Sequence, residues 1–198
     1  MSRVTDKQLI EFITRKNLPP SDPNNISREQ VHAFFRGRLV PKYHEYLQLV
    51  SEGVLGITAC EGNRTLAYAI DVFEAGIHSN LLKYETDKPG VATTTKKTKL
   101  SVYEIVRKGA FSELYGSIHE DMNRLCLTQH QIVTFCKTYR GWFRKDGDAT
   151  DFLFKVEDRF YVADVTLFTS GLDVCLYMLG EEESPNSSRF LVVPIQTV

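Results

Sequence analysis

Long apolar runs are missing from this sequence. No stretch approaches the ~18–20 apolar residues that a helix needs to cross a bilayer, and residues 1–7 lack the apolar core of a signal peptide. A surplus of one charge is missing too, since 24 Lys and Arg stand against 25 Asp and Glu, for a net charge of −1. No global field therefore draws the chain to nucleic acid or lipid. We expect a cytosolic protein without a membrane partner, whose binding to any polyanion would need a local patch.

The motifs of several enzyme classes are also absent. The sequence contains no G-x-x-x-x-G-K or G-x-G-x-x-G phosphate loop and no G-x-S-x-G serine elbow. The four cysteines, Cys60, Cys126, Cys136 and Cys175, form no C-x-x-C pair and have no histidine at zinc-ligand spacing. We therefore expect reduced cysteines that pack as small apolar side chains, and neither a cofactor nor a metal ion.

What the sequence does contain is a repeated helix start. Thr128 and Gln131 can form a capping box, in which each side chain accepts a hydrogen bond from the backbone N–H of the other. The same spacing recurs in two earlier stretches, Thr5 with Gln8 and Ser27 with Gln30. The uneven intervals exclude a repeat of fixed period, which leaves independent helix starts or a duplicated helical unit. Helices are predicted over residues 5–16, from 27, and over 43–50, 102–106, 111–115 and 127–139.

The last third of the chain is rich in strand-forming residues. Four strands are predicted over residues 152–156, 160–168, 172–178 and 189–194, joined mostly by short turns into an antiparallel meander. A hairpin is predicted from residues 54–59 and 66–73, and a long surface loop over 76–99. We expect an α+β fold in which N-terminal and central helices pack on the C-terminal meander. Its parts are an N-terminal helical segment (1–53) and an α+β domain (54–198), or one domain over 1–198.

Several short stretches resemble a known family. They are AIDVFEAGI at 69–77, VYE at 102–104, GAF at 109–111, LCLTQHQI at 125–132, FLFKV at 152–156 and FYVA at 160–163. In this order they resemble a family of small uncharacterised bacterial proteins, over roughly residues 69–165. The family has no assigned function, so the resemblance implies no site residue.

Two residues are candidates for catalysis. Asp71 lies in an apolar run, where a buried carboxylate needs a partner. It is either a paired structural carboxylate or part of a metal or acid–base site with Glu74 or Asp87. His119 stands next to two acidic residues, although adjacent residues of a helix point in different directions. An enzyme hypothesis is therefore a hydrolase with a carboxylate–histidine site at Asp71 and His119, which must meet in a cleft.

A basic aromatic segment is the stronger functional signal. It contains four cations and the only tryptophan: Lys137, Arg140, Trp142, Arg144 and Lys145. Lys96, Lys97 and Lys99 can extend the patch. Cations neutralise phosphates and aromatic rings stack on bases, but cations also suit a helix C-terminus, and Trp142 can close the core. We expect a non-enzymatic binding protein for nucleic acid or for an acidic protein. The third alternative is a homo-oligomeric subunit whose meander edge pairs across chains.

Overall fold

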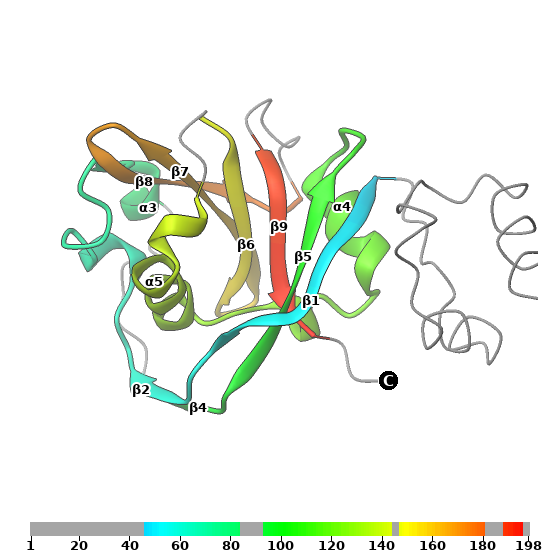
Figure 1. Ribbon diagram of the computed structural model, residues 1–198, viewed down its shortest axis with the longest axis horizontal. Helices are drawn as coiled ribbons and strands as arrows, with labels where there is room; N and C mark the ends of the chain where they lie inside the picture. Colours follow the sequence, from blue (N-terminus) through cyan, green and yellow to red (C-terminus); the bar gives the residue numbers. More distant parts are fainter. Residues whose placement is uncertain (1–45, 84–92, 144–146, 181–187, 196–198) are drawn as a thin grey trace, which may run out of the picture. The chain divides into compact units, whose positions relative to one another are not determined.

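A seven-stranded mixed sheet forms the centre of the part of the chain that the structure describes (Figure 1). This computed structural model describes residues 46–83, 93–143, 147–180 and 188–195, all within the compact unit Tyr43–Val198. The strand order is β1-β5-β9-β6-β7-β8-β3, and a separate ribbon pairs β2 with β4. The bounds are β1 (Leu47–Ile57), β2 (Cys60–Gly62), β3 (Gly76–Ile77), β4 (Thr93–Thr95), β5 (Thr98–Ile105), β6 (Ala149–Val156), β7 (Arg159–Phe168), β8 (Gly171–Met178) and β9 (Ser188–Pro194).

Short helices accompany this sheet. The α-helices are α3 (Asn80–Lys83), α4 (Phe111–Ile118) and α5 (Gln129–Thr138), and the 3₁₀ turns are η1 (Leu66–Tyr68), η2 (Met122–Leu125) and η3 (Arg140–Trp142). The predicted capping box of α5 is confirmed: the Gln131 N–H donates to the Thr128 hydroxyl at 3.1 Å, and the Thr128 N–H donates to the Gln131 side chain at 2.9 Å. α5 therefore begins where local sequence predicts.

The helices α4 and α5 cover opposite faces of the sheet. Successive residues of a strand point to opposite faces, so Phe152 of β6 packs with α5 while Leu153 packs with α4. Both side chains are fully buried, as are Phe135 of α5 and Leu114 of α4. The sheet thus separates two hydrophobic clusters, which we call the α5 side and the α4 side.

The predicted architecture of helices on a C-terminal antiparallel meander is wrong. β6, β7 and β8 do form a meander, but β9 leaves it and inserts between β5 and β6, parallel to β6. The sheet is therefore mixed and continues through β5 and β1. Long-range pairing of β9 places it beside strands that lie far from it in the sequence, which a reading of neighbouring segments cannot show.

Two predicted helices are strands. Residues 47–50 begin β1, and residues 102–105 belong to β5, which pairs with β1 on one side and β9 on the other. Val102 and Ile105 are three apart, which suggested one helical face. In β5 they point to opposite faces, and both are buried because both faces of the sheet are covered.

The predicted hairpin and loop also need correction. Residues 54–57 of the predicted hairpin do lie in a strand, β1. Leu66 instead begins the 3₁₀ turn η1, and the buried residues of this segment, Leu66, Ala69, Val72 and Phe73, do not alternate as in a strand. The predicted loop over 76–99 contains β3, α3, β4 and the start of β5, and residues 84–92 lie outside the described residues. The boundary predicted at 53/54 falls inside β1.

The helices predicted over 5–16 and from 27 also lie outside the described residues, whereas those over 111–115 and 127–139 are confirmed as α4 and α5.

Candidate anion-binding surface

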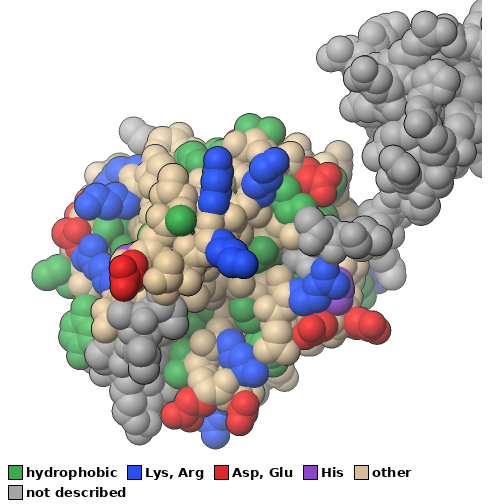
Figure 2. All heavy atoms as spheres, turned by 90° about the horizontal axis from the view of Figure 1, so that it is seen from below, with side chains coloured by type: hydrophobic (Ala, Val, Ile, Leu, Met, Phe, Trp, Pro, Cys, Tyr) green, Lys and Arg blue, Asp and Glu red, His purple; other side chains and the backbone are tan. Residues whose placement is uncertain are grey.

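A basic turn joins β4 to β5. Lys96, Lys97 and Lys99 are all exposed, and the part of the chain that the structure describes gives none of them an ion pair. The Thr98 hydroxyl donates to the carbonyl of Lys96 at 2.9 Å and so closes the turn. Figure 2 shows Lys and Arg side chains gathered in the middle of the face on which the β2–β4 ribbon lies. We call Lys96, Lys97 and Lys99 the lysine turn. They make a local positive field on a chain of near-zero net charge.

The base of the lysine turn is tied to α5. The Gln131 side-chain amide donates to the Thr98 hydroxyl at 3.1 Å, and the Tyr139 hydroxyl donates to the carbonyl of Gly56 at 2.8 Å. In the adjoining ribbon, a Cβ at Gly62 would lie 2.4 Å from the His130 ring, so this close approach requires glycine. Hydrogen bonds and close packing therefore present the lysines on a fixed base.

An open groove of about 270 Å³ lies at the amino end of α5. It is lined by residues 62–65, by residues 126–130 and by Lys155 of β6. Among the described residues that line it are two cations, Arg64 and Lys155, as well as His130, but no carboxylate. The positive end of the α5 dipole adds to these charges. This site, the α5 groove, suits a negatively charged group.

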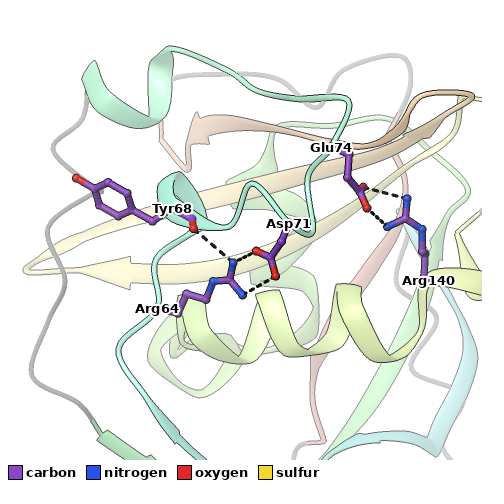
Figure 3. Close-up of polar contacts among 5 residues, drawn as sticks. All are labelled: Arg64, Tyr68, Asp71, Glu74 and Arg140. Atoms are coloured by element: carbon purple, nitrogen blue, oxygen red, sulfur yellow. Dashed lines mark hydrogen bonds and ion pairs between the residues drawn. The ribbon is translucent and has the colours of Figure 1, made fainter.

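Arg64 also fixes the segment that follows it. Its guanidinium donates to both carboxylate oxygens of Asp71, one at 3.2 Å, and to the carbonyl of Tyr68 at 3.4 Å (Figure 3). The Leu66 N–H donates to the Gln129 side chain at 2.9 Å. Asp71 is thus a paired carboxylate, one of the alternatives open from the sequence, and η1 is held between Arg64 and α5.

The structure does not bring Asp71 and His119 together. Asp71 lies beside Arg64 over α5 (Figure 3), whereas His119 ends α4 on the other face of the sheet. There the Asp121 N–H donates to His119 Nδ1 at 2.9 Å, and Arg124 Nη1 lies 2.9 Å from His119 Nε2. The geometry that the hydrolase hypothesis requires is therefore absent from this pair.

Arg140 and Trp142 of the basic aromatic segment make contacts within the protein itself. Arg140 binds both oxygens of Glu74, at 2.6 and 2.9 Å (Figure 3), and these bonds lower the pKa of the Glu74 carboxyl and raise the pKa of Arg140. Trp142 is half-buried, with ring centroids 6.0 Å from Phe135 and 5.5 Å from Phe190. Lys137 is exposed on the last turn of α5. Arg144 and Lys145 lie outside the described residues.

A second polar constellation is enclosed. Asp151 and Asp164 are opposite neighbours on β6 and β7, and they are 0% and 5% exposed. Burial, together with the charges of these carboxylates, raises the pKa of the fully buried Tyr115 hydroxyl on α4 well above its usual value. Because none of the three faces solvent, we treat the group as a polar layer of the α4 side.

Sequence reasoning missed Arg64, Tyr68 and Lys155. Lys155 did carry a signal, since it is the polar residue in an otherwise apolar strand, but nothing assigned it to a site. Tyr68 sits in an apolar run that was predicted to be a strand, and no neighbouring residue marks it, or Ile70 two residues later, as exposed. The groove itself joins three segments far apart in the chain, which spacing within the sequence cannot reveal.

Comparison of the chain with protein-family models, curated proteins and solved structures found no match. The resemblance to a family of small bacterial proteins stays a prediction. In the described ranges, no helix has both the length and the apolar character that spanning a membrane requires. Any functional conclusion therefore depends on the geometry described above.

Proposed function

We propose that this protein is a cytosolic, non-enzymatic nucleic-acid-binding protein that contacts phosphates through the lysine turn. One observation carries the proposal: three of four consecutive residues are exposed lysines, and the described part of the chain pairs none of them with a carboxylate. Each such cation can displace counterions from a phosphate backbone, which favours binding. The α5 groove nearby contains Arg64 and Lys155, whose charges are partly offset by Asp71 and by Asp158, the latter 3.9 Å from Lys155.

The same contacts favour nucleic acid over an acidic protein. Protein interfaces depend on a few central anchors, most often Trp, Tyr or Arg. In the predicted patch, the candidate anchors Trp142 and Arg140 are engaged by Phe135 and Glu74 of the protein itself. Lysines act as flexible point charges, which suits the repeated phosphates of a backbone. Binding through the lysine turn should thus be salt-dependent and independent of Trp142.

The test is a fluorescence-anisotropy titration of the full chain with labelled single- and double-stranded DNA and RNA. The double variant K96Q/K97Q should lower the affinity for every nucleic acid. It should also reduce the slope of log K against log salt by about 2, because two phosphate contacts are lost. Fluorescence of Trp142, the only tryptophan, should not change on saturation.

The matched control removes two exposed cations from the opposite end of the same strand. Arg107 and Lys108 follow the end of β5, whereas the lysine turn precedes and begins it. The variant R107Q/K108Q should keep the affinity within about twofold, because these residues lie a strand length away. Three outcomes would contradict the proposal: no binding at low salt, equal losses in both variants, or equally tight binding of polyglutamate.

A further inference from the structure

We propose that Tyr68 is a stacking platform for one base of a single-stranded nucleic acid, whose backbone runs from the lysine turn through the α5 groove. The inference rests on the proposed nucleic-acid binding and adds the kind of strand that is bound. Single strands are recognised where a positive groove that follows the backbone adjoins an exposed aromatic ring. The described residues supply both parts on neighbouring segments.

Tyr68 presents an uncovered ring. It is 61% exposed, and its only interactions among the described residues are made by its backbone. In Figure 3 the ring points away from Arg64 and from the body of η1. An aromatic face in this position is open to a flat partner, and every base offers such a face.

The segment that carries the ring is held firmly. Leu66, the first residue of η1, and Ala69, which follows η1, are 0% exposed. The Tyr68 N–H donates to the carbonyl of Thr65 at 3.3 Å, and its own carbonyl accepts from Arg64. A platform fixed in this way loses little conformational freedom when a base stacks on it.

Arg64 joins the platform to the α5 groove. Arg64 lines the groove, and its guanidinium bonds the Tyr68 carbonyl. Residues 62–65 line one side of the groove. At the start of this stretch, Gly62 pairs with Thr93 in the β2–β4 ribbon, and β4 leads directly into the lysine turn. The lysine turn, the groove and the segment that carries Tyr68 are thus linked through paired or adjacent residues, and the Tyr68 ring lies outside the lining of the groove.

The order of these groups favours a single strand. Phosphates would lie at the lysine turn and in the α5 groove, and a base would lie on Tyr68. A duplex keeps its bases stacked on one another and offers none to a side chain, whereas a single strand can turn a base out. The predicted preference is thus for single-stranded over double-stranded nucleic acid, without strong sequence preference.

The experiment titrates the full chain with a single-stranded oligonucleotide, the same oligonucleotide carrying abasic sites, and its duplex. Tyr68→Ala should lower the single-strand affinity by about 5- to 100-fold. It should leave the abasic and duplex affinities within about twofold and the salt slope unchanged, because no phosphate contact is lost. Tyr68→Phe should retain wild-type affinity, since the ring remains. Thermal melts of each variant check that the fold is intact.

Phe168 supplies the matched control. It is another exposed aromatic residue, 50% exposed, at the end of β7. Lys155 of the groove pairs with Phe160 near the start of β7, so Phe168 lies a strand length from the groove. Phe168→Ala should leave all three affinities unchanged.

The outcomes separate this inference from the proposed function. Wild-type single-strand affinity in Tyr68→Ala, or equal affinity for intact and abasic strands, would overturn the platform. If K96Q/K97Q were still defective, backbone binding would stand. A preference for duplex would also overturn the platform. Absence of binding to every nucleic acid would instead remove the proposed function itself.

Discussion

At Arg140, a cation that the sequence assigned to a binding surface is engaged within the protein. Its guanidinium binds both oxygens of Glu74, a residue 66 positions earlier in the chain. The pair ties the segment after η1 to the end of α5 (Figure 3). Both side chains remain partly exposed, so water and salt weaken the attraction. The bond nevertheless takes Arg140 out of the set of free cations.

This pair predicts a pH-dependent contribution to stability. Hydrogen bonds from Arg140 lower the pKa of Glu74 below its usual value in the folded state. A carboxyl with a lowered folded-state pKa stabilises the fold above its unfolded pKa, and this stabilisation is lost as the pH falls through the folded pKa. Glu74→Gln should therefore lower the melting temperature at pH 7, and the difference from wild type should shrink as the pH falls below the unfolded pKa of about 4.3 and vanish once the pH is below the lowered folded pKa.

Glu61 provides the control for this measurement. It is an exposed glutamate on β2, and the described residues give it no ion pair. Melting curves of Glu61→Gln should follow wild type at both pH values. A difference for Glu74→Gln that persists in acid would show that the substitution acts by some route other than the charge of the pair.

Among the elements, α5 shows the clearest agreement between sequence and structure. Its first turn is closed by the side chains of Thr128 and Gln131, which are three residues apart. Its inner face is set by the helical spacing of Ile132, Phe135 and Cys136, all fully buried. Burial raises the pKa of the Cys136 thiol, which matches the prediction of a reduced cysteine acting as a small apolar residue. Interactions between residues this close in the chain can be predicted from the sequence.

The cap of α5 can be tested by substitution. Thr128→Ala removes the hydroxyl that accepts from the Gln131 N–H, and it should lower the free energy of unfolding by about 1 kcal/mol. Thr128→Ser keeps an acceptor and should change it by only a few tenths of that amount. Urea denaturation of the three proteins measures both effects. Equal stability of wild type and Thr128→Ala would mean that the cap contributes nothing.

The strand β1 shows the opposite case. It is one of the two outer strands of the sheet in the described residues, and it exposes Leu49, Val50 and Val54. Its register with β5 shifts at two places, and Gly53 there has a φ of +72°. Such irregularities hinder addition of a further strand to an edge. The third alternative from the sequence was pairing across chains through the meander edge, but β6 pairs with β9 and β8 with β3 in the described residues, and a homo-oligomer stays a prediction.

For the molecule as a whole, β6 is the structural centre. It pairs with β7 on one side and with β9 on the other, and its residues contribute to both hydrophobic clusters. The capped helix, the α5 groove and the polar layer of Asp151 and Asp164 are all positioned by this strand and its neighbours. Loss of packing on one face of the sheet should therefore lower the stability of the other face as well.

Leu153→Ala tests that coupling. Leu153 is fully buried on the α4 side, and truncating it should cost about 2–5 kcal/mol of unfolding free energy. Trp142 reports from the α5 side. In urea, Trp142 fluorescence and far-UV circular dichroism should shift to lower midpoints together, as expected of one cooperative unit. Separate midpoints for the two probes would show that the two sides unfold independently.

The sequence by itself determined the features whose partners are close in the chain. These are the capped start of α5, the helix α4, and the successive hairpins of β6, β7 and β8, where short turns join neighbouring strands. Only the tertiary structure decided that β9 lies between β5 and β6, and that residues 47–50 and 102–105 are strands. It also decided that Trp142 packs on Phe190 while Tyr68 stays exposed. The physical reason is that pairing and burial between distant segments outweigh the weak local preferences of each segment, so the candidate surface became visible only once those segments were brought together.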